Sequence, residues 1–425
     1  MNARTFAKIC HNAPCIVLNE AVKQLRIYNN IIPSISASLA NYSLTLSVEI
    51  SIFMILRHLS EIGKGIIRED EGLIESWMQN CSNFISLTIK KHHRIDLTGI
   101  FVFIANRLAS DSDKESVFVV LFKDIITRMS GYESVSSFTQ TQLSSLSGGI
   151  GLKTEAFGLF EQVRTAKKSS NSLADFLKSQ NNHVRVFCDN DVEYTLSLPV
   201  YLIILMSRMR DKLVYKSDLS KPTLINMLFD MINESLVQFG LFLSSYPEFF
   251  TNRCQLLPDN PWEVMTNLKV SPEIAYQILR YSFKPIYKLE ETEWSEVVQK
   301  FKSSFDDFPY KTQYIAAAVE NDKISSYAEG ERAKMWQMMS PELFTLFWYL
   351  DSEHLFVPQD AYNTQIADLL KESKSDSKSD KNLDRAKKNI EALKQEMSSK
   401  LVEKEKLNRY LQGKKDQLIA NFFNS

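Results

Sequence analysis

The most constraining feature of this sequence is a row of apolar residues, spaced three and four apart, that recurs along most of its length. Clear rows run through residues 97–108, 118–129 and 224–243. On an α-helix this spacing places the members of a row on one face, which must be buried against a neighbouring element. The chain is therefore predicted to form helices that pack side by side.

Helix boundary signals agree with this periodicity. Serine, proline and glutamate, an order typical of a helix N-terminus, occur at 271–273 and again at 340–342. Thr139 and Gln142 have the spacing of a capping box, and Gly residues at 148–149 end the short helix that follows. Gly and Pro are each only 12 of 425 residues, whereas sheet-based enzymes use Gly freely in hairpins and phosphate loops.

We expect an all-α fold, an α-solenoid of stacked antiparallel helices of the HEAT or MIF4G type, followed by a long charged C-terminal helix. No fixed-period sequence repeat accompanies the helices, so this architecture rests on the apolar rows alone. Residues 1–180 are predicted to form a MIF4G-like helical repeat region, and 181–370 a further helical scaffold region. Residues 371–425 are predicted to be a charged linker and a long helix.

Residues 183–196 differ from their helical surroundings. Val184, Val186 and Cys188 alternate with other residues, and a second alternating run follows Asn190 and Asp191. This pattern is typical of a small hairpin inserted between helices, or of a simple loop. Both interpretations stay open.

The C-terminal segment has its own composition. Residues 371–425 hold 14 Lys/Arg and 9 Asp/Glu, a net charge of +5, whereas the rest of the chain carries −6. Residues 371–380 are low in complexity and charged, which predicts a solvated linker. Beyond it, apolar residues recur on a seven-residue register at Leu383, Ile390, Met397, Leu411 and Leu418. A helix with such a sparse apolar seam requires a partner helix.

The string most typical of an enzyme is GGIGLKT at residues 148–154. A phosphate-binding loop needs a buried strand before it and a Gly-Lys-Ser/Thr end, but Leu152 separates Gly151 from Lys153. The alternative, a helix-ending loop, is favoured. His92 and His93 lie among cationic residues near a helix end, without the further ligands that a metal site needs.

Other chemical signals are weak. The five cysteines are irregularly spaced and favour neither a disulfide framework nor a zinc site. The longest apolar run, 198–206, is too short to cross a bilayer. We predict no catalytic, cofactor-binding or metal-binding residues, no small-molecule substrate and no membrane partner, so the chain is not expected to be an enzyme.

Basic residues mark two candidate interaction surfaces. Arg164, Lys167 and Lys168 share one helix face that could bind phosphates or an acidic protein surface, or could simply be solvated. In the C-terminal helix, the candidate RNA-contacting residues are Lys387, Lys388, Lys400, Lys404, Arg409, Lys414 and Lys415. The alternative there is a solvated helix that pairs with a partner coiled coil.

Several idiosyncratic strings, in the same order along nearly the whole chain, resemble the THO complex subunit 2 family. They are NARTFAK (2–8), IDLTGIFVFIANRLA (95–109), ITRMSGYE (126–133), TQTQLSSLSGGIGLKTEA (139–156), RTAKKSS (164–170), LVQFGLFL (236–243), SPELFTLFWYL (340–350) and VPQDAY (357–362). Members of that family are much longer, so the resemblance implies a middle fragment or a truncated product. The segment around 184–195 looks longer than the family usually has.

The resemblance implies a role rather than a reaction. The family is the large helical scaffold of the THO complex, the core of the transcription–export (TREX) assembly in the nucleus. It holds other THO subunits and positions a DEAD-box RNA helicase, whose ATPase activity couples transcription to mRNA packaging and export. RNA would be met directly or within an mRNP. An RNA-binding module acting through the basic C-terminal helix is the alternative, and an NTPase resting on GGIGLKT is a third hypothesis.

Overall fold

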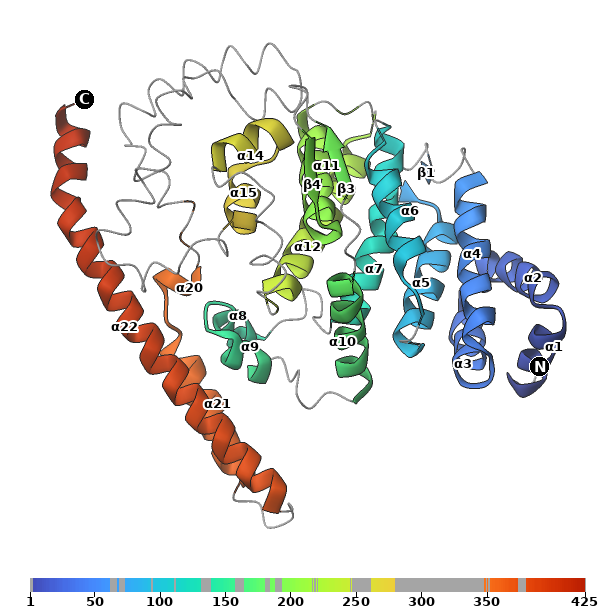
Figure 1. Cartoon of the computed structure of the whole chain (residues 1–425), viewed down its shortest axis with the longest axis horizontal. Helices are drawn as coiled ribbons and strands as arrows, with labels where there is room; N and C mark the ends of the chain where they lie inside the picture. Colours follow the sequence, from blue (N-terminus) through green and yellow to red (C-terminus); the bar gives the residue numbers. More distant parts are fainter. Residues whose placement is uncertain are drawn as a thin grey trace. The chain divides into compact units, whose positions relative to one another are not determined.

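A computed structural model gives the fold, and outside two short hairpins and the connecting turns the residues that it describes are helical (Figure 1). The described residues are 3–61, 67–68, 73–92, 95–110, 112–130, 139–156, 164–179, 184–187, 193–215, 217, 219, 221–244, 246, 261–279, 348, 350, 352–373 and 380–424. The all-α class is confirmed for these residues, and their stacking as a solenoid stays a prediction.

The chain divides into two compact units. Unit 1 comprises residues 1–135, 162–185 and 195–249, and unit 2 comprises 136–161, 186–194 and 250–425. The predicted division into regions 1–180, 181–370 and 371–425 stays a prediction.

Unit 1 is built from helices that pack both on neighbours in the sequence and on helices from much later in the chain. In the described residues they are α1 (Ala3–Asn12), α2 (Pro14–Ile27), α3 (Ile32–Tyr42), α4 (Thr45–Glu61), α5 (Ser76–Lys91), α6 (Thr98–Leu108), α7 (Val119–Ser130), α10 (Arg164–Ser179), α11 (Leu198–Tyr215) and α12 (Pro222–Ser244), with short 3-10 turns at Asn29–Ile31 and Asp113–Phe118. Helix α2 packs on α4 and α5, α3 on α5, α5 on α7, and α7 on α10 and α12.

The predicted apolar rows form the core of unit 1. The row from Leu97 to Leu108 is buried on α6, and the row from Phe118 to Met129 is buried on α7. The Phe122 ring of α7 meets the ring of Phe101 edge-on at 6.1 Å and the ring of Phe239 at 5.2 Å between centroids. Three helices therefore share one aromatic cluster. The rows predicted that each face is buried, but not which helices meet.

Two short hairpins interrupt the helices. Strands β3 (Val184–Phe187) and β4 (Glu193–Leu196) pair in a two-stranded sheet, so of the two interpretations left open for 183–196 the hairpin is the right one and the loop is wrong. Strands β1 (Ile67–Arg68) and β2 (Leu73–Ile74) form a second, antiparallel pair that the sequence analysis missed. At two residues a strand, β1 and β2 are too short to show a period-two pattern.

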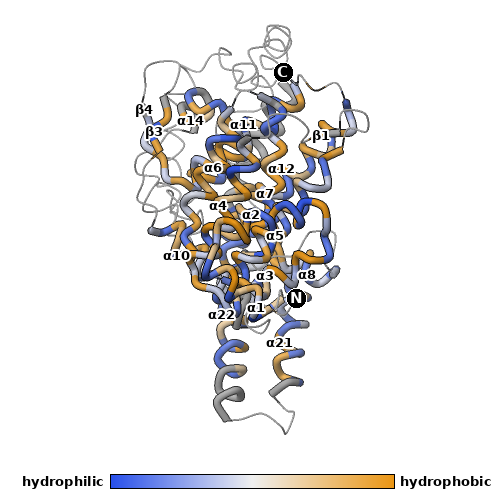
Figure 2. The backbone as a smooth tube through the Cα atoms, turned by 90° about the vertical axis from the view of Figure 1, so that its right-hand side faces the viewer, coloured by the Kyte–Doolittle hydropathy of each residue, from blue (hydrophilic) through white to orange (hydrophobic). Residues whose placement is uncertain are grey.

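Unit 2 gathers segments that are far apart in the sequence. Its described helices are α8 (Gln140–Ser145), α9 (Ile150–Ala156), α14 (Pro261–Leu268), α15 (Pro272–Leu279), α20 (Ser352–Leu355), α21 (Gln359–Ser373) and α22 (Asp380–Asn424). The N-terminal signal at 271–273 is confirmed by α15, whereas 341–347, which hold most of the other signal's helix, lie outside the described residues. Helices α21 and α22 lie side by side (Figures 1 and 2).

The long C-terminal helix is confirmed, and its apolar seam meets a partner within the same chain. Helix α22 has 45 residues, a length of about 68 Å at 1.5 Å per residue. Ile390 and Leu393 are buried with Tyr362 of α21 and Leu152 of α9 in one apolar cluster, against which Met397 and Leu401 also pack. Figure 2 shows apolar and polar residues alternating along α21, as expected where a helix buries one face.

Candidate functional site

The GGIGLKT segment connects two short helices of unit 2. Thr139 Oγ1 accepts from the Gln142 amide at 3.3 Å while Gln142 Oε1 accepts from the Thr139 amide at 3.0 Å, so the predicted capping box of α8 is confirmed. After α8, the Gly148 amide donates to the Ser145 carbonyl at 3.0 Å. Helix α9 then begins at Ile150. The glycines therefore end one helix, as predicted, and also open the next.

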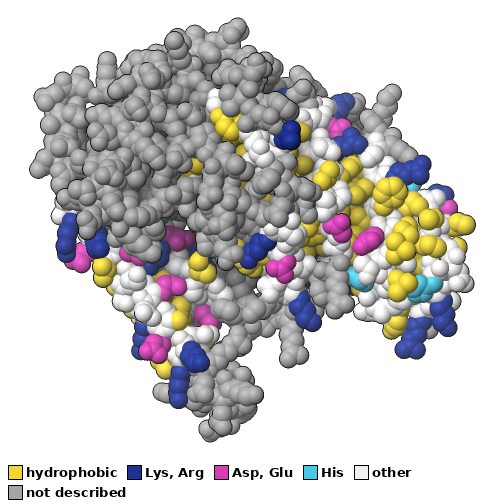
Figure 3. Space-filling model, viewed as in Figure 1, with side chains coloured by type: hydrophobic (Ala, Val, Ile, Leu, Met, Phe, Trp, Pro, Cys, Tyr) yellow, Lys and Arg dark blue, Asp and Glu magenta, His cyan; other side chains and the backbone are white. Residues whose placement is uncertain are grey.

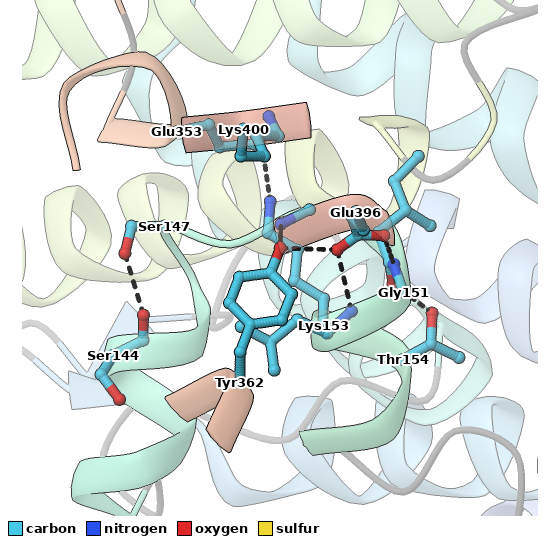
Figure 4. Close-up of polar contacts among 12 residues, drawn as sticks. Ser144, Ser147, Gly151, Lys153, Thr154, Glu353, Tyr362, Glu396 and Lys400 are labelled. Carbon is cyan, nitrogen blue, oxygen red and sulfur yellow. Dashed lines mark hydrogen bonds and ion pairs between the residues drawn. The ribbon is translucent and has the colours of Figure 1, made fainter. Parts of the chain in front are cut away.

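A carboxylate from α22 lies at the first turn of α9. Glu396 Oε2 accepts from the Gly151 amide at 2.8 Å, and Glu396 Oε1 accepts from the Leu152 amide at 3.3 Å (Figure 4). The first amides of a helix have no partner inside the helix, and the helix dipole favours an anion beside them. Glu396 thus takes the place that a phosphate oxygen takes in a phosphate-binding loop.

Tyr362 of α21 completes this arrangement. Its hydroxyl donates to Glu396 Oε1 at 2.7 Å and accepts from the Gly149 amide at 3.0 Å. Burial of the ring, with smaller contributions from the hydrogen bond and the charge of Glu396, raises the pKa of the Tyr362 phenol well above its usual range. The phenol therefore keeps its proton at neutral pH and can donate it to the carboxylate.

Glu396 lies so close to the backbone at Gly149 and Gly151 that neither position has room for a side chain. A Cβ added at Gly149 would lie 2.4 Å from Glu396 Oε1, and one added at Gly151 would lie 2.6 Å from Glu396 Oε2. No side-chain carbon tolerates such distances, so any larger residue displaces the carboxylate. The close approach of Glu396 therefore explains glycine at these two positions, and no bound nucleotide is needed to explain it.

Lys153 is the residue that would bind phosphates in a nucleotide site, but its side chain is paired with a carboxylate of the protein. Its buried ammonium group forms an ion pair with Glu353 of α20. The second oxygen of the same carboxylate lies 3.3 Å from Lys400 Nζ of α22 (Figure 4). A buried ammonium group is stable only with such a partner. Glu353 therefore joins α9 to α22 through α20.

The candidate RNA-contacting residues of α22 whose side chains are described fall into a packed group and an exposed group. Lys400 faces Glu353, and Lys404 Nζ lies 5.7 Å from the centre of the Phe356 ring, so both point toward the packed side. Lys387 and Lys388 are exposed. Arg409 is also exposed and lies 3.7 Å from a carboxylate oxygen of Glu405. The side chains of Lys414 and Lys415 lie outside those described, although both residues belong to α22.

The second predicted basic surface lies at the start of α10. Lys168 is exposed, and the side chains of Arg164 and Lys167 are outside the described set. Its role in binding stays a prediction.

The described residues contain no cluster of three or more His, Cys, Asp or Glu side chains arranged to hold a metal ion. In that same part of the chain, no helix combines the length and the apolar character that crossing a membrane requires.

Sequence reasoning missed Glu396, Tyr362 and Glu353. Each acts on a residue more than 190 positions away, since Gly151 and Glu396 are 245 apart and Lys153 and Glu353 are 200 apart. One signal was available: Glu396 follows Leu393 by three positions, which puts an acid beside the buried seam of α22.

Comparison with known proteins points to one family. A family profile described as "Transcription- and export-related complex subunit" matches residues 6–82, and another described as "Transcription factor/nuclear export subunit protein 2" matches 336–424. THO complex subunit 2 of Homo sapiens is 27% identical over 377 residues, which are 87% of this chain and 22% of that protein. The Arabidopsis thaliana protein of the same name is 24% identical over 383 residues, 86% of this chain and 20% of its own. The chain thus spans about a fifth of the length of these curated relatives.

Proposed function

This chain belongs to the THO complex subunit 2 family, and on that premise we propose that it is a non-catalytic scaffold segment of the THO/transcription–export complex. It holds partner subunits and a DEAD-box RNA helicase in the nucleus, and so helps to couple transcription with mRNA packaging and export. The observation that carries the proposal is the likeness to THO complex subunit 2 over 87% of the chain.

The geometry of unit 2 supports a scaffold rather than an enzyme. The segment most similar to a nucleotide-binding loop has three of its amides bonded to Tyr362 and Glu396. Its lysine is paired with Glu353. A nucleotide would have to displace both interactions before it could bind, at a cost in free energy for each group left unpaired.

The packing of unit 1 supports the solenoid part of the proposal. Helix α1 packs on α2 and α3, α2 packs on α4 and α5, and α5 packs on α7, so contacts in this part of unit 1 join helices one to three places apart in the chain. An array in which each helix pair contacts its neighbours leaves long outer faces for binding other proteins. We place the subunit and helicase contacts on those faces.

Affinity purification tests the scaffold proposal. The tagged chain, recovered from nuclear extract, is expected to bring other THO subunits and the DEAD-box helicase with it. Phe122→Asp, which puts a charge into the aromatic cluster of unit 1, serves as a control for recovery that does not depend on the fold. Recovery of neither THO subunits nor the helicase with the unaltered chain would contradict the proposal.

Direct RNA binding is the second candidate function, favoured by the exposure of Lys387 and Lys388 on α22. If both contact phosphates, Lys387→Ala/Lys388→Ala should flatten the dependence of log affinity on log salt by about 1.4 for single-stranded RNA. Lys23→Ala, which removes an exposed lysine of α2, is the matched control. An unchanged salt slope in the double variant would remove this pair from the RNA-binding surface.

A further inference from the structure

Polar side chains join three elements of unit 1 along one face of α5. The Asn80 amide of α5 donates to the Arg26 carbonyl near the end of α2 at 3.2 Å. The Asn83 amide donates to Asn29 Oδ1, just beyond α2, at 3.4 Å. The guanidinium group of Arg128, on α7, donates to Asn83 Oδ1 at 2.7 Å. Because positions 80 and 83 lie on the same face of a helix, the two arginines reach α5 close to each other.

Arg26 is held by an aromatic ring and not by a carboxylate. Its guanidinium carbon lies 4.8 Å from the centre of the Trp77 ring of α5. A cation–π contact uses the face of the guanidinium group and leaves the N–H donors at its edge for other partners. Within the part of the chain that the structure describes, Arg26 forms no ion pair, and its buried Nε has no hydrogen-bond partner. Arg26 is therefore a half-buried cation whose charge an anion would balance.

Arg128 is a second half-buried cation, and its hydrogen bond is to a neutral amide. Asn83 takes one of its N–H donors, whereas a guanidinium group carries several. The carboxyl group of Asp124, one turn earlier on α7, accepts from Ser82 Oγ at 2.6 Å. Burial raises the pKa of this carboxyl group, and the Ser82 hydrogen bond and the charge of Arg128 partly offset the rise. Among the described residues, Arg128 thus keeps donors that can bind a further acceptor.

Two exposed residues beside Arg26 offer groups that a simple anion does not need. The Tyr28 side chain is 52% exposed, and Asn29 is exposed. Figure 3, in the same view as Figure 1, shows many hydrophobic side chains over the N-terminal helices, so the exposure of Tyr28 alone identifies no site. Beside two cations, however, an exposed ring and an exposed amide match the parts of a nucleotide. A base stacks on the ring, and the amide can form hydrogen bonds with a base edge or the ribose.

The spacing along α5 favours a strand of nucleotides over a single anion. Trp77 and Asn83, the side chains that contact the two guanidinium groups, are six positions apart, about 9 Å along the helix. A single phosphate ion bonded to one arginine at about 2.8 Å is too small to reach both, whereas successive phosphates of one strand can. An acidic peptide would pair with the arginines but has no base for Tyr28. A duplex would keep the faces of its bases inside the stack.

We propose that this part of unit 1, called the arginine surface below, binds a short single strand of nucleic acid. It consists of Arg26, Tyr28, Asn29, Trp77, Asn83 and Arg128. The two arginines bind phosphates and the Tyr28 ring stacks on a base, while Trp77 and Asn83 hold the guanidinium groups in place. The arginine surface is distinct from the basic residues of α10 and α22. The inference goes beyond the proposed scaffold role and does not depend on it.

Fluorescence anisotropy with the purified full chain tests the inference. The probe is a labelled single-stranded oligonucleotide of mixed sequence, prepared as RNA and as DNA. Tyr28→Ala should weaken binding at least about five-fold, because one stacked base is lost. Arg128→Gln keeps an amide for Asn83 but loses a phosphate contact, so the slope of log affinity against log salt should flatten by about 0.7. Arg26→Lys keeps the charge but loses the planar fork, so it should weaken binding several-fold without changing that slope.

A matched control and a second measurement locate the contact. Tyr215→Ala removes a tyrosine that is 40% exposed on α11 and should bind the probe like the unaltered chain. Ultraviolet crosslinking followed by mass spectrometry should find the strand on peptides that contain Tyr28 or Trp77. RNA and DNA offer the same phosphates and stacking bases, so the form that binds more tightly identifies the source of the strand. If Arg128→Gln lowers the folded content measured by circular dichroism, Tyr28→Ala decides, because its exposed ring is not part of the core.

Four results would overturn the inference. The first is no binding of either single strand, and the second is unchanged affinity in Tyr28→Ala. The third is crosslinking confined to α22, which would assign nucleic-acid binding to the other candidate surface. The fourth is displacement of the probe by a glutamate-rich peptide at lower concentration than by the unlabelled strand, which would assign the arginine surface to an acidic protein. None of these results depends on whether THO subunits co-purify with the chain, so the proposed function is tested separately.

Discussion

Replacing Glu396 with alanine should release the start of α9 from α22. The carboxylate accepts from the Gly151 amide, the Leu152 amide and the Tyr362 hydroxyl. A hydrogen bond to a charged group contributes about 1.5 to 3 kcal/mol, and a neutral one about 1 kcal/mol. Because water can reach part of this site, we take only about 1 kcal/mol, the value of a neutral hydrogen bond, for each of the three bonds. Glu396→Ala is then expected to cost about 3 kcal/mol.

The effect is best measured locally. Because the chain has two compact units, a global unfolding measurement would combine the transitions of both. Hydrogen exchange, followed by mass spectrometry on a peptide covering residues 148–153, reports the opening of this segment directly. A loss of about 3 kcal/mol corresponds to exchange about 150-fold faster, as long as the segment opens by itself rather than with the whole unit.

Two variants of α22 calibrate the experiment. Glu396→Gln keeps one carbonyl acceptor but loses the charge, so it should lie between the unaltered chain and Glu396→Ala. Glu391→Ala removes an exposed carboxylate of the same helix and should change exchange at 148–153 by less than about three-fold. If Glu396→Ala behaved like Glu391→Ala, the capping role of Glu396 would be wrong.

Three further predictions concern two residues of the glycine loop in unit 2 and one buried thiol in unit 1. Gly149→Ala should displace the Glu396 carboxylate, because the added Cβ would occupy the same space. The double variant Gly149→Ala/Glu396→Ala should therefore speed hydrogen exchange at 148–153 by much less than the product of the two single effects. If the two effects simply multiply, Gly149 and Glu396 do not act on the same interaction. The unaltered chain and Lys153→Ala should both bind a fluorescent ATP analogue no better than background. The substitution should destabilise unit 2 by about 1 to 2 kcal/mol, because Glu353 loses one of its partners. Nucleotide binding that depends on Lys153 would instead support the NTPase hypothesis. Burial raises the pKa of the Cys81 thiol to about 12, slightly offset by the charge of Arg26, so the folded state holds this proton more tightly than the unfolded state. The free energy of unfolding should then fall as pH rises from about 9 to 12. Below about pH 9, iodoacetamide should modify the exposed thiol of Cys15 and leave the buried thiol of Cys81 unmodified. Modification of both thiols at equal rates would contradict the burial of Cys81.

Local patterns predicted much of this fold because their causes are local. The row from Phe118 to Met129 forms a buried face since its spacing matches the turn of a helix, whatever lies opposite. The capping box at Thr139 and Gln142 closes within four residues, and the hairpin at 183–196 alternates over short strands. In each case the residues that form the pattern lie close together in the sequence.

The partner of the α22 seam shows where such reasoning ends. The seven-residue register predicted that α22 needs a partner helix, and Ile390 and Leu393 are buried with residues of α21 and α9. The register cannot say which helix that is, because α9 lies more than 200 residues earlier in the chain. The residues that select it are polar ones outside the register, among them Glu396 and Asn389, whose amide donates to Glu155 Oε1 at 2.7 Å.

The glycine loop shows why a phosphate-loop pattern and a structural turn can have almost the same letters. Both present unpaired helix amides to an anion at close range, and both need glycine where that anion approaches the backbone. What differs is the source of the anion, a nucleotide in one case and here the Glu396 carboxylate of α22. In this chain the same chemistry therefore fixes α22 against α9, α20 and α21, and so gives the exposed residues Lys387 and Lys388 a defined direction within unit 2. The proposed scaffold role would depend on that rigidity, because a long helix held in one direction can present its outer face to one partner rather than to many.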